Sequence, residues 1–295
     1  MGIDELNRLF EKPAPVQTIQ YKSLQDAGVQ MDMLRLDLLH PQISGNKWYK
    51  LRYFIREAQE QKAAGVLSLG GPWSNHLHAL AYTSQLLNLP SVGLVRGEPV
   101  SNACLHDCNA WNMKLHFVSR SDYRQKAASS FLDAWKNQYP DYYIIPEGGD
   151  APQGISGAAG MLQGISVDTY SHIAIAVGTG TSFRGLLQVV PSETRLLGFC
   201  AMKGGGYLEA LWENEHKSRY ELFTGYHEGG FGSTNSGLEN FIKTFYQETG
   251  IPLDRVYTAK MMRGLLDLCG RGYFAPTSRL LFIHTGGLQG NRSLS

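Results

Sequence analysis

Short apolar runs alternate with amphipathic stretches along most of the chain, and this alternation restricts the fold more than any other feature. Seven runs have strand-like composition: residues 66–69, 91–95, 114–119, 142–146, 172–177, 195–201 and 279–285. Between them, apolar residues recur at helical spacing, as in residues 51–58 and 77–87. Strands that alternate with helices imply right-handed crossovers and largely parallel sheets. We therefore predict an α/β fold with open, largely parallel sheets.

Composition narrows the class of protein. The chain has 295 residues, 43% of them hydrophobic, which is enough for one large or two smaller domains. Its formal charge of +1 gives no basic surface for nucleic acid or for a membrane. The first 13 residues are polar and acidic, unlike a signal peptide, and no run of 18 apolar residues could span a bilayer.

Cysteine usage argues against disulfides and metal. The four cysteines are few and scattered, which is typical of reduced thiols in a cytoplasmic protein. Cys104 and Cys108, with His106 between them, could form half of a zinc site. No second ligand pair follows at a matching spacing, so we predict no metal.

Glycine concentrates after the predicted strands. The four clusters are GGPWSN (70–75), EGGDAPQG (147–154), GTGTS (178–182) and HTGG (284–287). Ligands of open parallel sheets bind beyond the carboxyl ends of the strands, where such loops lie. One glycine loop alone can be explained by turn geometry. Four of them, together with a lysine pair, favour a binding site.

The loop of residues 178–182 has the composition of an anion site. It joins a strand to a helix start, and Thr179, Thr181 and Ser182 add hydroxyl donors beside Gly178 and Gly180. The glycine spacing fits neither the Walker loop nor the dinucleotide fingerprint. A phosphate monoester on a small cofactor fits better.

Two lysines, Lys47 and Lys50, stand at the start of a predicted helix. The helix dipole and the neighbouring like charges both favour a neutral amine there, which lowers the lysine pKa. A neutral amine is a nucleophile that can form a Schiff base with an aldehyde, while the second lysine can contact a phosphate. Two exposed lysines beside a helix start are the alternative.

Five motifs occur together in one order. They are S-G-N-K-x-x-K-L (44–51), G-G-x-x-S-N-H (70–76), Y-I-I-P-x-G-G (143–149), V-Y-T (256–258) and H-T-G-G (284–287). With these motifs the chain resembles the 1-aminocyclopropane-1-carboxylate deaminase / D-cysteine desulfhydrase family from about residue 15 to 290. That family uses pyridoxal 5′-phosphate on the two-domain, tryptophan-synthase-β-like fold (fold type II), with the cofactor in the interdomain cleft.

The resemblance implies a set of cofactor ligands. Lys47 matches the lysine that forms the Schiff base. Lys50 and the loop from Gly178 to Ser182 match the groups that hold the cofactor phosphate. Asn75 matches the residue that hydrogen-bonds the phenolic oxygen of the cofactor.

The resemblance also implies substrate and ring contacts. Ser74 matches the residue that binds the substrate carboxylate or assists proton transfer. Tyr257 matches the tyrosine that lies beside the cofactor ring and the substrate. Thr258 matches the position that faces the pyridine nitrogen, with Thr285 nearby. The resemblance therefore assigns catalysis to Lys47, Ser74 and Tyr257.

Three departures from the family bear on the reaction. The position of Thr258 is a glutamate in the deaminases, a family tyrosine is replaced by Phe231, and Trp73 stands where glutamine is usual. A hydroxyl leaves the ring nitrogen largely neutral, as in relatives that carry out β-elimination. These changes argue against opening of a cyclopropane ring.

The predicted function is a pyridoxal-phosphate-dependent lyase that resembles D-cysteine desulfhydrase. It would convert a small amino acid to a keto acid, ammonia and sulfide. The alternatives are a 1-aminocyclopropane-1-carboxylate deaminase and a cofactor-binding relative with little turnover. We expect a cytoplasmic homodimer with a large cofactor-binding domain of residues 1–48 and 150–295 and a small domain of residues 49–149.

Overall fold

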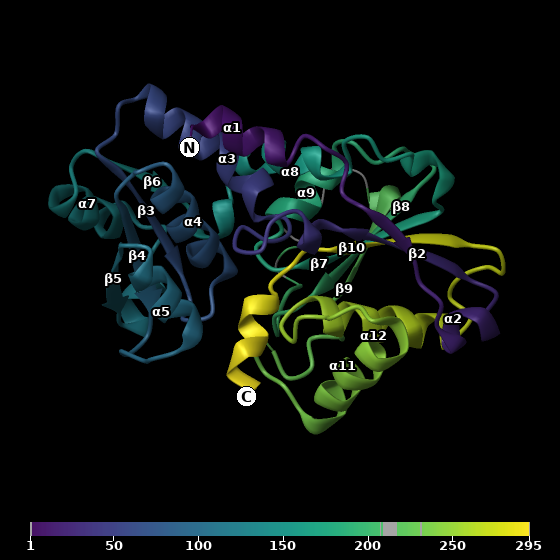
Figure 1. Ribbon diagram of the computed structural model, residues 1–295. Coiled ribbons are helices and arrows are strands. Elements are labelled where there is room, and N and C mark those ends of the chain that lie inside the picture. Colours follow the sequence, from purple (N-terminus) through teal and green to yellow (C-terminus); the bar gives the residue numbers. More distant parts are fainter. Residues whose placement is uncertain (1, 207, 209–216, 231, 295) are drawn as a thin grey trace.

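Two separate β-sheets organise the chain (Figure 1). The computed structural model describes residues 2–206, 208, 217–230 and 232–294. Within these residues the larger sheet has the order β1 (Val16–Thr18), β2 (Gln30–Arg35), β10 (Arg279–His284), β7 (His172–Val177), β8 (Arg195–Cys200) and β9 (Tyr220–Phe223). The smaller sheet has the order β5 (Met113–Val118), β4 (Ser91–Arg96), β3 (Gly65–Gly70) and β6 (Tyr142–Ile145).

The sheets are largely parallel, as predicted. Only β1 runs antiparallel to its neighbour among the strand pairs that the structure describes. All seven predicted strands are confirmed. The sequence missed β1, β2 and β9: the first is an exposed three-residue edge strand, Asp32 interrupts the apolar pattern of the second, and the third has four residues.

Helices connect the strands. The α-helices are α1 (Ile3–Leu9), α2 (Lys22–Asp26), α3 (Lys47–Glu60), α4 (Asn75–Leu86), α5 (Ala103–Ala110), α6 (Arg120–Tyr123), α7 (Ser129–Gln138), α8 (Pro152–Ala159), α9 (Thr181–Leu187), α11 (Ser236–Thr249) and α12 (Thr258–Gly270). The 3₁₀ turns are η1 (Leu36–Leu38), η2 (Glu147–Gly149), η3 (Gly160–Leu162), η4 (Val167–Thr169), η5 (Lys217–Arg219) and η6 (Leu288–Leu294). None of the helices described is long and apolar enough to cross a bilayer.

Strands β7, β8 and β10 of the larger sheet are buried on both faces, which explains their continuous apolar sequences. In β7, Ile173 and Ile175 pack with α8 and α9, whereas Ala174 and Ala176 face α11 and α12. Figure 1 shows these helix pairs on opposite sides of the sheet. These three strands therefore have no water-exposed face, and their carboxyl ends are the open edge available to a ligand.

Helix α3 packs where the two sheets approach. Its Phe54 and Ile55 belong to one buried cluster with Val66 of the smaller sheet and Ile175 of the larger sheet. Two sheets rather than one continuous sheet agree with the predicted fold class. The division of the chain into domains at residues 48/49 and 149/150 stays a prediction.

Candidate active site

One pocket lies at the carboxyl ends of strands from both sheets. Residues that follow β3, β6, β7, β8 and β10 line it, together with Arg96 at the end of β4. All four glycine clusters that the sequence singled out contribute to this lining. A pocket therefore lies at the strand ends where the glycine loops predicted a ligand, and both sheets build it.

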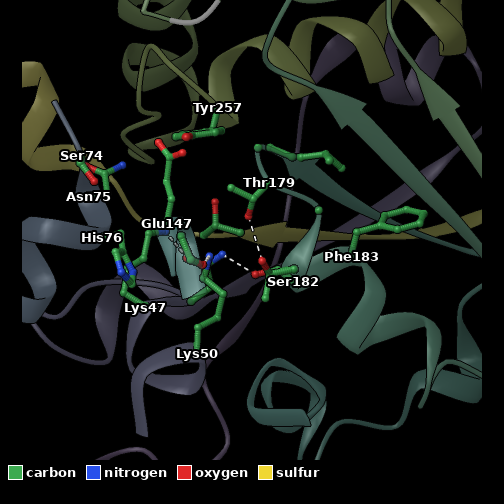
Figure 2. A pocket seen from close by; sticks show the side chains of 18 of the residues that line it. Lys47, Lys50, Ser74, Asn75, His76, Glu147, Thr179, Ser182, Phe183 and Tyr257 are labelled. Atoms are coloured by element: carbon green, nitrogen blue, oxygen red, sulfur yellow. Dashed lines mark hydrogen bonds between the residues drawn. The ribbon is translucent and has the colours of Figure 1, made fainter. Parts of the chain in front are cut away.

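Most of the predicted site residues meet in this pocket. Those that line it are Lys47, Lys50, Ser74, Asn75, Gly178, Thr179, Gly180, Thr181, Ser182, Tyr257 and Thr285. Thr258 and Trp73 are not among the described residues of the lining, and Phe231 lies outside the described residues. Figure 2 shows Ser74, Asn75 and His76 on one side and Thr179 and Ser182 on the other, with the two lysines below them.

The start of α3 is fixed by a close approach of two loops. Gly45 has φ of +73°, and a Cβ there would lie 1.8 Å from the carbonyl oxygen of Thr285. No larger residue fits, so Gly45 brings the lysine helix against the end of β10. Asn46 then donates from Nδ2 to Ser182 Oγ at 2.8 Å and accepts from Lys47 Nζ. This amide links the lysine to the hydroxyl loop.

The pKa values of the two lysines are lowered mainly by desolvation, rather than by their position at the helix start. Desolvation lowers the pKa of Lys47 to about 8, against the attraction of Asp254. Desolvation and then the charge of Lys47 lower the pKa of Lys50 to about 7. The predicted direction of the lysine pKa shifts is therefore confirmed, but the largest cause is desolvation rather than the helix dipole and like charges expected from the sequence. The alternative of two exposed lysines is wrong, because Lys50 is buried and Lys47 lines the pocket.

The pocket lining favours an anion. Among the described residues of the lining, three are basic, Lys47, Lys50 and Arg96, and one, Glu147, carries a carboxylate. Lys50 Nζ donates to the carbonyl oxygen of Gly148 at 2.6 Å. Buried cations without equal acidic partners are unfavourable until an anion reaches them.

The hydroxyls opposite the lysines form a second group. Thr179 and Thr181 lie 2.8 Å apart at Oγ1, and Ser182 Oγ accepts from Asn46. A hydroxyl carries one hydrogen and two lone pairs, so Ser182 still has its hydrogen for an acceptor in the pocket. Gly180, with φ of +88°, lets the chain turn from β7 into α9 at this point.

Helix α4 begins at the other wall. Ser74 is its N-cap, and Ser74 Oγ accepts from Leu77 N at 3.2 Å. The first N–H groups of a helix have no intrahelical carbonyl, so the backbone N–H groups of Asn75 and His76, which Ser74 does not cap, can reach a ligand. Asn75 follows in the first turn and accepts at Oδ1 from Gln289 Nε2 at 2.6 Å.

His76 is held as a neutral imidazole. Ser68 Oγ donates to Ile145 O at 2.8 Å, so it accepts from His76 Nε2 at 2.9 Å. His76 Nδ1 is therefore an acceptor, and it is buried with no hydrogen-bond partner among the described residues. Burial, then the charges of Lys50 and Lys47, lower the His76 pKa well below its usual value.

Thr258 is placed differently from the expectation. It is fully buried, donates to Asp254 Oδ1 at 2.7 Å and accepts from Asp254 N at 2.8 Å. The Asp254 carboxylate also accepts from the backbone N–H groups of Val256, Tyr257 and Thr258. Thr258 thus closes the turn before α12, whereas Thr285 is the threonine on the pocket wall.

Tyr257 lines the pocket as a neutral phenol. Burial, followed by the charges of Asp254 and Glu147, raises the pKa of Tyr257.

Three features of the pocket were not predicted from the sequence: the hydrogen bonds of Asn46, the Glu147 carboxylate and Arg96. Asn46 and Glu147 lie inside the family motifs of residues 44–51 and 143–149, so the motifs could have identified both positions.

The comparisons define first the class of fold. A solved structure described as an ACC deaminase homologue matches 96% of this chain and 92% of its own, at 26% identity and a TM-score of 0.83. The chain has the tryptophan-synthase-β-like, fold type II architecture, as its motifs predicted. No protein-family model matches the chain.

Curated relatives then indicate which enzymes of this fold the chain resembles. A putative 1-aminocyclopropane-1-carboxylate deaminase of Pyrococcus horikoshii is 28% identical over 94% of this chain and 90% of the relative. A D-cysteine desulfhydrase of Klebsiella pneumoniae is 26% identical over 97% of both. The chain is a homologue of the proteins that carry these two names, and the predicted resemblance is confirmed.

Proposed function

We propose that this protein is a pyridoxal-phosphate-dependent lyase that carries out β-elimination and deamination of a small amino acid, in the manner of D-cysteine desulfhydrase. The products would be a keto acid, ammonia and sulfide. The observation that carries the proposal is the pairing of a half-buried, easily neutralised lysine, Lys47, with a cationic, hydroxyl-rich pocket.

The residues present fit pyridoxal phosphate. Lys47 is the amine that would meet its aldehyde. Lys50 and the hydroxyls of Thr179, Thr181 and Ser182 would hold its phosphate, and Asn75 would donate to its phenolic oxygen. A phosphate dianion beside Lys50 would also supply the anion that this buried cation lacks. When bound, the cofactor supplies an electron sink for the bonds of the amino-acid α-carbon.

Lys47 would act as the base. With a pKa of about 8, about a tenth of this amine is neutral at pH 7, far more than for an ordinary lysine, and can accept the α-proton. Asn46 holds the amine toward the pocket through its Oδ1. General acid–base help of this kind contributes about 10²–10⁴-fold to the rate.

Two other residues would position the substrate. Ser74 and the N-terminal N–H groups of α4 would receive the substrate carboxylate. Tyr257, whose pKa is raised, stays protonated and can donate to a departing thiolate or to the substrate.

Thr285, rather than Thr258, would face the pyridine nitrogen. Thr285 lines the pocket, while the Thr258 hydroxyl is used by Asp254. A hydroxyl is a weaker partner for a protonated ring than a carboxylate, because charged acceptors bond about twice as strongly. β-Elimination tolerates this because the leaving group takes charge away. Thr285→Val should change the absorption of the bound cofactor, whereas Thr258→Val should chiefly lower stability.

A substrate panel tests the function. D- and L-cysteine, β-chloroalanine and 1-aminocyclopropane-1-carboxylate would be compared, with keto acid, ammonia and sulfide measured. We expect sulfide and pyruvate from one cysteine enantiomer and little ammonia from the cyclopropane. Efficient turnover of the cyclopropane alone would favour the deaminase, which the Pyrococcus relative's name makes the second candidate.

Two further expectations remain proposals. The protein would act as a homodimer, which analytical ultracentrifugation can test, and in the cytoplasm, which cell fractionation can test. A cofactor-binding protein without turnover would show absorbance from bound pyridoxal phosphate but no product from any amino acid in the panel.

A further inference from the structure

The last turn of the described chain reaches the site. Segment η6 follows two glycines, Gly286 and Gly287, with φ of +74° and +93°. Figure 1 shows this segment, in yellow, between the smaller-sheet helices and α12. None of the five family motifs extends into η6, so its residues were assigned no role from the sequence.

Gln289 of η6 bonds directly to Asn75. Its Nε2 donates to Asn75 Oδ1 at 2.6 Å. A carboxamide has one acceptor oxygen and one NH₂ donor. Because Gln289 takes the oxygen, the Asn75 NH₂ is left to donate elsewhere. With Gln289 in this orientation, reversal of the Asn75 amide alone would bring two NH₂ groups together.

The surroundings leave the Asn75 amide little room. A Cβ on Gly287 would lie 2.7 Å from Asn75 Nδ2. The turn before η6 therefore passes close to this nitrogen, and only glycine fits there at positive φ. Gln289 thus holds the oxygen end of the amide while the Gly287 turn lies beside its nitrogen end.

Segment η6 is itself anchored on both sides. Asn291 Nδ2 donates to Leu253 O at 2.9 Å, before α12. Arg292 forms an ion pair with Asp107 of α5, next to the smaller sheet. These contacts fix the backbone that carries Gln289, so its side chain reaches Asn75 from a constrained segment.

We propose that Gln289 is a positioning residue that fixes the Asn75 carboxamide with its NH₂ group available to the phenolic oxygen of the cofactor. The proposal rests on the proposed function, because that function supplies the ligand. The cofactor oxygen carries negative charge, so an NH₂ group stabilises it and a carbonyl oxygen repels it. Without Gln289 the amide could present either end.

Gln289→Glu provides the sharpest test. A carboxylate only accepts, so it would bond the Asn75 NH₂ and turn Asn75 Oδ1 toward the cofactor. Gln289→Leu removes the hydrogen bond without forcing a reversal. Gln247→Glu, on the exposed face of α11, is the matched control for the added charge. The probe is pyridoxal phosphate, added to each cofactor-free chain.

The measurements are the dissociation constant for pyridoxal phosphate, the pH titration of its bound absorption band and the melting temperature of the cofactor-free chain. We expect Gln289→Glu to weaken cofactor binding about tenfold or more and to raise the pKa of the bound chromophore by about one unit. Gln289→Leu should change the dissociation constant and the chromophore pKa in the same directions but by smaller amounts. Gln247→Glu should match the wild type in both.

The outcomes separate the two proposals. If the wild type binds the cofactor and both Gln289 variants keep its affinity and titration, Gln289 has no positioning role. If only the melting temperatures fall, its role is structural and the proposal is overturned. If the wild type takes up no pyridoxal phosphate, the proposed function itself fails. Should the glutamate variant not fold, the leucine variant decides.

Discussion

Helices α3 and α4 both begin at the pocket, but their first turns differ in charge and in capping. Helix α3 places the half-buried Lys47 and the buried Lys50 at its positive end. Its Asn46 N-cap makes no capping bond, because the amide serves Lys47 and Ser182. Helix α4 has a capping serine, Ser74, and no charged residue in its first turn.

The difference separates two kinds of anion recognition. In α4 the backbone itself supplies the positive field, so a substrate carboxylate would meet fixed N–H groups. In α3 the side chains supply the charge, and burial makes that charge easy to neutralise. A titrating amine is needed for proton transfer, whereas a fixed dipole is enough for binding.

Removing Lys47 should have the largest effect. Lys47→Ala deletes the proposed base and the site of cofactor attachment, so kcat should fall about 10³-fold or more. Borohydride reduction followed by peptide mapping should place the pyridoxyl group on Lys47 in the wild type. Lys243→Ala, on the exposed surface of α11, is the control and should keep full activity. A pyridoxyl group found on Lys50 or Lys203 would refute the assignment.

Lys50 should matter for binding rather than for proton transfer. Lys50→Met keeps the volume but removes the charge beside the proposed phosphate site, so affinity for pyridoxal phosphate should fall about 10–100-fold. At saturating cofactor, kcat should recover to within a fewfold of the wild type. Equilibrium titration followed by absorbance measures the affinity. A kcat that stays as low as in Lys47→Ala would remove the distinction between the two lysines.

The two lysines should make the cofactor-free protein more stable as pH rises from 7 to 8. Their folded-state pKa values of about 8 and about 7 lie below the unfolded value of 10.5. The unfolded chain therefore binds more protons in this window, and stability increases with pH, by about 1 kcal/mol. Above that window, cysteines with raised pKa act in the opposite direction.

Urea unfolding at the two pH values measures this gain, and Lys50→Met should remove most of it. A free energy of unfolding that falls between pH 7 and pH 8 would contradict the burial of neutralisable lysines. Bound cofactor should mask the effect, since its phosphate would keep Lys50 charged.

Local sequence patterns were sufficient to predict where the strands and the pocket loops lie, but not which side chains point into the pocket. The apolar runs located β3 to β8 and β10, and the glycine clusters located the pocket, because both depend on neighbouring residues. Whether Thr258 or Thr285 faces the pocket depends on Asp254, whose carboxylate takes the first hydroxyl. The bond between Gln289 and Asn75 joins residues 214 apart in the sequence, and neither residue's neighbours signal it.

The smallest predicted effect concerns Ser74, and it tests the α4 half of the comparison. Ser74→Ala removes the N-cap acceptor of Leu77 N, which should lower the free energy of unfolding by about 1 kcal/mol. It also removes one donor for the substrate carboxylate, so KM should rise several-fold while the N–H groups of α4 continue to bind. Ser74→Gly should keep more of the stability and show the same KM. If Ser74→Ala lowers kcat as strongly as Lys47→Ala does, Ser74 takes part in proton transfer, and α4 is more than a binding element.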